Sequence, residues 1–171
     1  QAELEARDYP GAYHRVAYRK PDGTPLYVET TRPELVVSAV ALIAHPDDER
    51  YAGLFGTTVT SPVFGVEIPV LAHPAAEPDK GAGIAMCCTF GDLTDVIWWR
   101  ELRLPTRSVI TRAGRVQAEV PAWVADAKGD RGTEVFEEMA GKTVHSAREV
   151  VVEALRASGD LDGEPQKTQR K

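Results

Sequence analysis

The chain has 171 residues, 43% hydrophobic and 27% charged, which indicates one globular domain long enough to bury a core. Its formal net charge of −6 is opposite to that of most free-standing nucleic-acid-binding domains, so a partner or a larger parent protein would have to supply much of any affinity for phosphate. No long apolar run and no signal-peptide pattern is present, which favours a soluble, cytoplasmic protein.

Residues 1–171 are interpreted as a single domain with linker-like ends at 1–10 and 160–171. The chain opens without methionine and closes in the polar strip DGEPQKTQRK, so we expect a domain excised from a longer protein. Its two cysteines, Cys87 and Cys88, are adjacent, without the spacing of a zinc site or a structural disulfide. They are expected to be reduced and to lie on opposite faces of a strand.

The first quarter of the chain predicts a β-hairpin followed by a buried strand. Residues 13–20 and 25–31 flank the turn sequence PDGT and are expected to pair. Pro33 suits the first position of a short helix. The continuous apolar run over 36–44 is divided between one helical turn and a buried strand.

The middle of the chain is expected to contain a short helix over 45–56, strands over 57–65 and 66–73 around a turn at Gly65, a loop over 75–83, a buried strand over 84–90 and a helix over 92–102. Trp98 and Trp99 diverge on that helix, so one of them is expected to face the core. A tryptophan that stacks on RNA is an alternative.

The last third predicts two strands over 105–120 and a helix over 133–140. A longer helix is expected between a Thr143 cap and Gly159. Strands outnumber helices and do not alternate strictly with them. The fold class is therefore predicted to be mixed α/β, with a barrel-like core of mostly antiparallel strands and peripheral helices.

Two segments carry candidate binding residues, each with an alternative explanation. In ETTRPEL, Thr30 and Thr31 could hydrogen-bond a ligand and Arg32 could hold a phosphate, or the segment is a strand end with an exposed arginine. In GDLTD, Asp92 and Asp95 could hold an ammonium group and a hydroxyl, or they stabilise a helix N-terminus. Composition and spacing leave both pairs of explanations open.

The sequence offers little for metal or covalent catalysis. His45, Asp47 and Asp48 are the candidates for a metal-dependent hydrolase, but no zinc-ligand spacing surrounds them. No nucleophile motif and no phosphate-binding glycine loop with lysine is present. We therefore expect no metal and no cofactor.

Several segments in order along the chain together resemble the editing domain of valyl-tRNA synthetase. They are DYPGAYHRV, ETTRPEL, VALIAHPDDERY, GVEIPVLAHP, DKGAGIAMCCTFGDLTD and GEPQKTQRK. Any one is weak, but the ordered set covers nearly the whole chain. The resemblance implies a domain that hydrolyses threonine wrongly attached to the valine tRNA and spares the correct product. A hydrophobic synthetic site rejects threonine only on the order of 10²-fold, so a second site is needed.

The resemblance also implies roles for particular residues. Asp95 would hold the substrate α-amino group and Asp92 would read the threonine hydroxyl. Arg32 would lie near the terminal adenosine and its phosphates, with Thr30 and Thr31 at the same mouth. Five further residues complete the set expected to bind substrate or tRNA: Glu34, Gly81, Gly83, Cys88 and Phe90.

The chain departs from the pattern of many family members, which have lysine and threonine where Met86 and Cys88 stand here. The role of that lysine and threonine in reading the hydroxyl is therefore not transferred. The implied mechanism is attack by a positioned water without a covalent intermediate. The partners would be the charged 3′ end of the valine tRNA and the rest of the synthetase, with the chain monomeric. The alternatives are an isoleucyl or leucyl editing domain and a non-catalytic module that binds the tRNA end.

Overall fold

The computed structural model describes residues 12–80, 82–88, 93–127, 131–163 and 166–167, and for 93–95 and 166–167 it describes the backbone alone. The strands are β1 Ala12–Arg19, β2 Pro25–Thr30, β3 Ala39–Ala44, β4 Thr58–Thr60, β5 Glu67–Ala72, β6 Ile84–Cys88 and β7 Gln166–Lys167. The helices are α2 Leu93–Glu101, α3 Ala122–Ala125, α4 Gly132–Met139 and α5 Val144–Ser158, with 3-10 turns η1 Pro33–Ser38 and η2 Ala52–Leu54.

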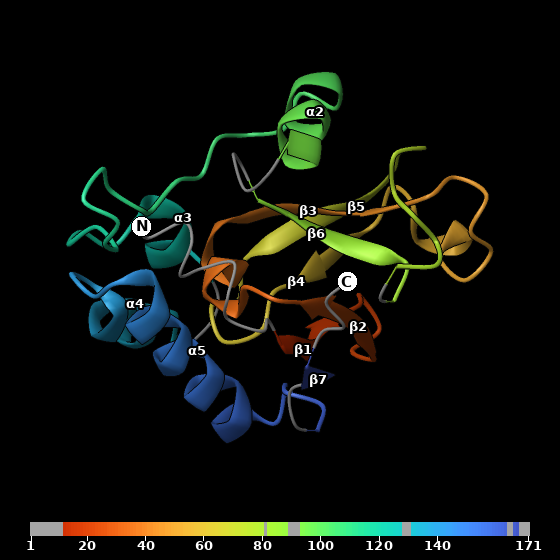
Figure 1. Ribbon diagram of the computed structural model, residues 1–171. Helices are drawn as coiled ribbons and strands as arrows, with labels where there is room; N and C mark the ends of the chain where they lie inside the picture. The colour runs from red at the N-terminus through yellow and green to blue at the C-terminus, as the bar shows by residue number, and fades with distance from the viewer. Residues whose placement is uncertain (1–11, 81, 89–92, 128–130, 164–165, 168–171) are drawn as a thin grey trace.

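The described strands form one sheet in the order β2-β1-β4-β5-β3-β6, and β7 pairs with β1 outside this path. All neighbouring pairs are antiparallel except β3 and β5, which run parallel. The sheet curls so that β2 and β6, the two ends of the path, lie against each other (Figure 1). The prediction of a mixed α/β fold around a barrel-like sheet is confirmed.

Strand β3 forms the centre of this architecture because all six of its residues are buried. Leu42 and Ala44 belong to the main core inside the barrel. Ala41 and Ile43 point the opposite way, into a smaller core that contains Trp98 of α2. Figure 1 shows α2 on the outer side of β3 and β6. The alternation of side chains along a strand therefore gives β3 two buried faces, which explains its continuous apolar run.

The C-terminal helices cover the other side of the barrel, and the prediction for them is confirmed. The Thr143 side chain accepts a hydrogen bond from the Ser146 amide and caps α5. Gly159 ends α5 in the left-handed conformation, with φ of 81°. Helix α5 packs on α4 and on η1, the turn that follows β2 (Figure 1).

Two segments differ from their predicted structure. Residues 45–56 contain turns and the short η2 in place of a helix. Residues 105–120 form isolated bridges in place of two strands, one between Ile110 and Val116 and one between Arg115 and Thr143. The two segments do approach each other, because the Thr111 amide donates to the Arg115 carbonyl and the Gln117 amide donates to the Val109 carbonyl. On its other side Val116 exchanges backbone hydrogen bonds with Gly141 and Lys142, so this short pairing is also joined to the turn before α5.

The linker-like C-terminal end also makes contacts that the sequence did not indicate. The Ala17 amide donates to the Asp160 carbonyl, and the Asp162 amide donates to the Arg15 carbonyl. The side chain of Asp160 accepts from Arg19 at 2.8 Å. Residues 160–162 therefore run along β1 as part of the fold.

The buried ring of His14 on β1 gives the fold a predictable pH dependence. Burial lowers the pKa of His14 below its ordinary 6.5 and outweighs the opposing hydrogen bonds to the backbone of Ala12 and Thr30, while Arg148 and Glu34 have smaller, opposite effects. The unfolded chain therefore takes up this proton at a higher pH than the folded chain, so stability is lost as pH falls from about 6.5. In urea titrations between pH 5 and 7, we expect His14→Gln to flatten this loss. The exposed His145, replaced in the same way, is the control, and an unchanged slope in His14→Gln would contradict the prediction.

Candidate functional site

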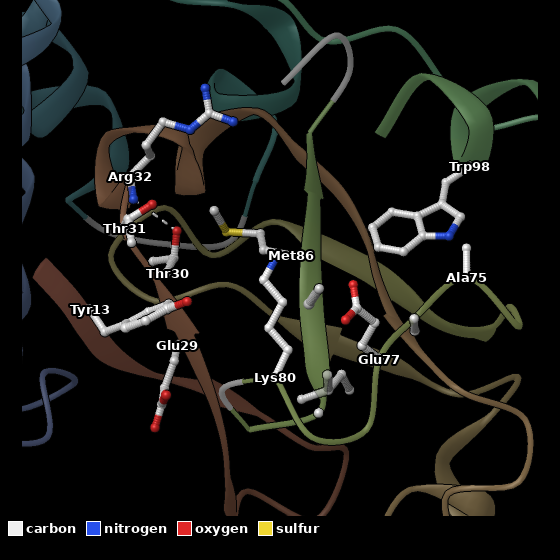
Figure 2. A pocket seen from close by; sticks show the side chains of 14 residues that line it. Tyr13, Glu29, Thr30, Thr31, Arg32, Ala75, Glu77, Lys80, Met86 and Trp98 are labelled. Carbon is white, nitrogen blue, oxygen red and sulfur yellow. Dashed lines mark hydrogen bonds between the residues drawn. The ribbon is translucent and has the colours of Figure 1, made fainter. Parts of the chain in front are cut away.

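A pocket of about 230 Å³ opens at the seam where β2 and β6 approach each other, and it is called the seam pocket below. Residues from the end of β2, the loop before β6, β6 itself and α2 line it (Figure 2). They are Tyr13, Glu29, Thr30, Thr31, Arg32, Ala75, Ala76, Glu77, Lys80, Gly83, Ile84, Ala85, Met86 and Trp98. The curl of the sheet therefore brings segments about fifty positions apart in the sequence to one cavity.

One rim of the seam pocket is the end of β2. The Arg32 amide donates to the Thr30 hydroxyl oxygen at 3.0 Å, which turns the chain sharply after Thr31 (Figure 2). In the part of the chain that the structure describes, the Arg32 guanidinium has no hydrogen-bond or ion-pair partner. A guanidinium with its donors available suits a phosphate or a carboxylate ligand. Thr30, Thr31 and Arg32 thus all line the seam pocket.

Glu34, two residues beyond this rim, faces away from the seam pocket. Its side chain is 1% exposed and accepts two hydrogen bonds from Arg148 of α5, at 2.8 and 3.0 Å. The same carboxylate raises the pKa of Arg148. Glu34 was expected among the residues that contact substrate or tRNA, but its carboxylate is committed to an ion pair that ties η1 to α5. The sequence could not indicate a partner 114 positions away.

The opposite rim is the loop before β6, which ends at Gly83 with φ of 82°. A Cβ at Gly83 would collide with Nη2 of Arg50 and would approach the Pro78 carbonyl oxygen to 2.8 Å. Nη2 of Arg50 donates to that carbonyl and to the Asp48 carboxylate, at 2.9 and 2.7 Å. The Tyr51 hydroxyl donates to the Ala82 carbonyl. Glycine is therefore required where this loop closes against residues 48–51.

Two of the residues considered for a metal site, His45 and Asp48, make contacts within the chain. The Asp48 carboxylate binds Arg50, whose side chain lowers the pKa of Asp48. Nδ1 of His45 accepts from the Asp47 amide. Among the described residues, no group of three histidine, cysteine or acidic side chains is arranged to hold a metal ion.

Strand β6 contributes a wall that contains sulfur. Sδ of Met86 accepts a hydrogen bond from the buried Tyr18 hydroxyl at 3.0 Å. Cys88, expected to contact substrate, is 3% exposed, and its thiol donates to the Leu35 carbonyl at 3.4 Å. Cys88 does not line the seam pocket, whereas Met86 does.

Trp98 closes the far end of the seam pocket beside Ala75 (Figure 2). Its ring is 4% exposed and packs edge-on against His73, whose Nε2 lies 2.6 Å from the Glu101 carboxylate. This contact joins the C-terminal end of α2 to the residue that follows β5. Trp98, and not Trp99, is thus the tryptophan that faces the core, as the helical spacing allowed.

Sequence reasoning missed several lining side chains: Tyr13, Glu29, Glu77 and Lys80. Figure 2 shows the Lys80 side chain extending into the cavity. Lys80 directly precedes the glycine-containing turn, and Tyr13 and Glu29 occupy the ends of the paired strands. Because these residues lie next to a predicted turn or at the ends of predicted strands, their positions could have indicated that they line a site.

Four of the expected site residues cannot be placed. Gly81, Phe90 and Asp92 lie outside the described residues. Asp95 lies in the first turn of α2, but its side chain is outside the described set. The roles of the two aspartates therefore stay predictions.

None of the described helices is both long and apolar enough to span a membrane. No family model matches the chain.

The chain is similar along its whole length to valine--tRNA ligases. It is 66% identical to that of Cutibacterium acnes over 100% of this chain and 19% of the ligase. It is 62% identical to that of Bifidobacterium longum over 99% of this chain and 18% of the ligase, and 59% identical to that of Thermobifida fusca over 98% and 19%. The chain thus spans about a fifth of the length of these curated relatives.

Two solved structures share the fold. The crystal structure of GlLeuRS-CP1 matches with a TM-score of 0.58 and 12% identity, over 95% of this chain and 100% of that chain. The ternary complex of Agrobacterium radiobacter K84 agnB2 LeuRS-tRNA-LeuAMS matches with a TM-score of 0.62 and 16% identity, over 93% of this chain and 20% of that chain. At such low identity the likeness extends to the fold alone. The sequence similarity is to valine ligases.

Proposed function

Because this chain belongs to the valine--tRNA ligase family, as a segment with the CP1 fold, we propose that it is an editing domain that hydrolyses threonine from mischarged valine tRNA. The observation that carries the proposal is the seam pocket, where the Thr30–Thr31–Arg32 rim faces the Gly83 loop and β6. A cavity of about 230 Å³ accommodates a small amino acid ester and leaves the rest of the tRNA outside.

Each part of the substrate has a suitable partner in this proposal. The Arg32 guanidinium binds a phosphate of the tRNA 3′ end, for which its fork of donors is suited. Thr30 and Thr31 provide hydroxyl groups at the mouth. Asp95, in the first turn of α2, holds the α-amino group. Asp92 reads the threonine hydroxyl.

The reaction is attack of a positioned water on the ester carbonyl, without a covalent intermediate. Holding the amino group and the phosphate at once fixes the carbonyl relative to the water, and such orientation supplies much of the rate. Selectivity follows from the hydroxyl, because valine would leave a polar group in the pocket unpaired. Threonine is therefore released while the correct product is retained.

The proposal predicts selective deacylation that depends on Asp95. We expect the full-length ligase that carries this chain to release threonine from valine tRNA faster than it releases valine, and Asp95→Ala to reduce the threonine rate on the order of 10²-fold. Arg32→Ala should raise KM about tenfold through loss of a charged contact. The exposed Arg112, replaced by alanine, is the matched control.

The measurement is release of radiolabelled amino acid from each charged tRNA over time, with the isolated chain assayed in parallel. Equal release of threonine and valine would contradict the specificity. Binding of charged tRNA without any hydrolysis would instead identify a non-catalytic module.

A further inference from the structure

The fully buried Tyr18 has an unusual hydrogen-bond acceptor. Its hydroxyl donates to Sδ of Met86, on the wall of the seam pocket, at 3.0 Å. Burial raises the pKa of Tyr18 well above its ordinary value, with a smaller contribution from Cys88, so the phenol keeps its proton and remains a donor. A tyrosine in the barrel core thus holds a side chain that lines the pocket.

This hydrogen bond matters because methionine is otherwise adaptable. Its unbranched side chain has three rotatable bonds and easily changes shape. With the sulfur directed at Tyr18, the position of the terminal methyl group is restricted. Figure 2 shows the Met86 thioether extending toward the side of the pocket formed by Thr30.

The opposite wall offers a hydrogen bond. The Thr30 hydroxyl oxygen already accepts from the Arg32 amide, at 3.0 Å. A hydroxyl also has one proton to donate, and among the residues that the structure describes no acceptor takes it, so it is offered to a ligand. A side chain that enters between Met86 and Thr30 therefore meets an apolar methyl group on one side and a hydroxyl donor on the other.

We propose that Met86, held by Tyr18, is a specificity-determining residue that packs against the methyl group of the substrate side chain, opposite the Thr30 hydroxyl. Only a side chain with one methyl and one hydroxyl on the same carbon satisfies both walls. Valine leaves the Thr30 proton unpaired, and serine leaves the Met86 methyl without a contact. This inference rests on the proposed editing function and adds the selection of threonine over serine.

The test compares deacylation of valine tRNA charged with threonine or with serine by the full-length ligase. Loss of one methyl contact in a hydrophobic pocket changes kcat/KM by roughly tenfold or more. Met86→Ala is therefore expected to lower kcat/KM for the threonine ester about tenfold and to leave the serine ester nearly unchanged. Met86→Leu, which restores an apolar wall, should recover most of the threonine-to-serine ratio.

Two further variants separate positioning from folding. Tyr18→Phe keeps the buried ring but frees Met86, so we expect the same ratio to fall by a smaller factor. Met139→Leu is the control, because Met139 is the other methionine of the chain and is fully buried outside the pocket. It should leave the ratio unchanged.

The outcomes are distinguishable. If Met86→Ala slows both esters equally, its role is merely structural and the inference is overturned. The same holds if the ratio does not change while deacylation continues. If the unaltered ligase fails to release threonine at all, the proposed function is overturned and this inference with it.

Discussion

Arg148→Ala is expected to lower the free energy of unfolding by about 3 kcal/mol, a large loss for the replacement of one partly exposed side chain. The reason is the partner that remains. Glu34 is 1% exposed, and without Arg148 its carboxylate is left buried and unpaired. Removing one partner of a buried ion pair typically costs about 3–5 kcal/mol, and we expect the lower end because 32% of the Arg148 side chain is exposed.

Urea denaturation followed by circular dichroism measures this loss. Arg156 is the matched control, since it lies on the same helix and pairs with the exposed Glu153 at 3.1 Å. Arg156→Ala should cost less than about 1 kcal/mol. The double replacement Glu34→Met/Arg148→Met should recover most of the stability, because an apolar pair of similar volume avoids the desolvation of both charges. Equal losses in Arg148→Ala and Arg156→Ala would show that the Glu34 pair is unimportant.

Gly83→Ala is expected to reduce deacylation on the order of 10²-fold, because a displacement of about 1 Å in a binding site can have that effect. The new Cβ would enter the space of Nη2 of Arg50 and approach the Pro78 carbonyl. Arg50 would have to release Pro78 or Asp48, and the loop that carries Lys80 into the seam pocket would shift.

A second glycine separates collision from backbone strain. Gly23 has φ of 88°, close to that of Gly83, but nothing lies within 4 Å of its Cβ position. Each alanine pays about 1–2 kcal/mol for the left-handed conformation. Gly23→Ala should therefore lose stability but keep the deacylation rate. If Gly83→Ala retained that rate as well, the loop would not need its observed position.

Most elements of the fold could be predicted because their signals are local. The hairpin of β1 and β2 follows from two apolar strands around a PDGT turn, and α5 follows from a Thr143 cap, helical spacing and Gly159. The end of β2 and the start of η1 were also predictable, because Pro33 three residues after the strand suits the first position of a helical turn. The strands expected over 105–120 are reduced to a short pairing around Ile110 and Val116, which also bonds to the turn at 141–142, a contact that no local pattern reveals.

The sequence by itself determined the periodicities, the turns and the segments that resemble valyl-tRNA synthetase, since these depend on neighbours within a few positions of one another. Only the tertiary structure decided which residues share a site. Glu34 turns from the pocket to Arg148, 114 positions away, and Met86 is held by Tyr18, 68 positions away. The physical reason is the curl of the sheet, which sets β2 against β6 and fixes partners by distance in space.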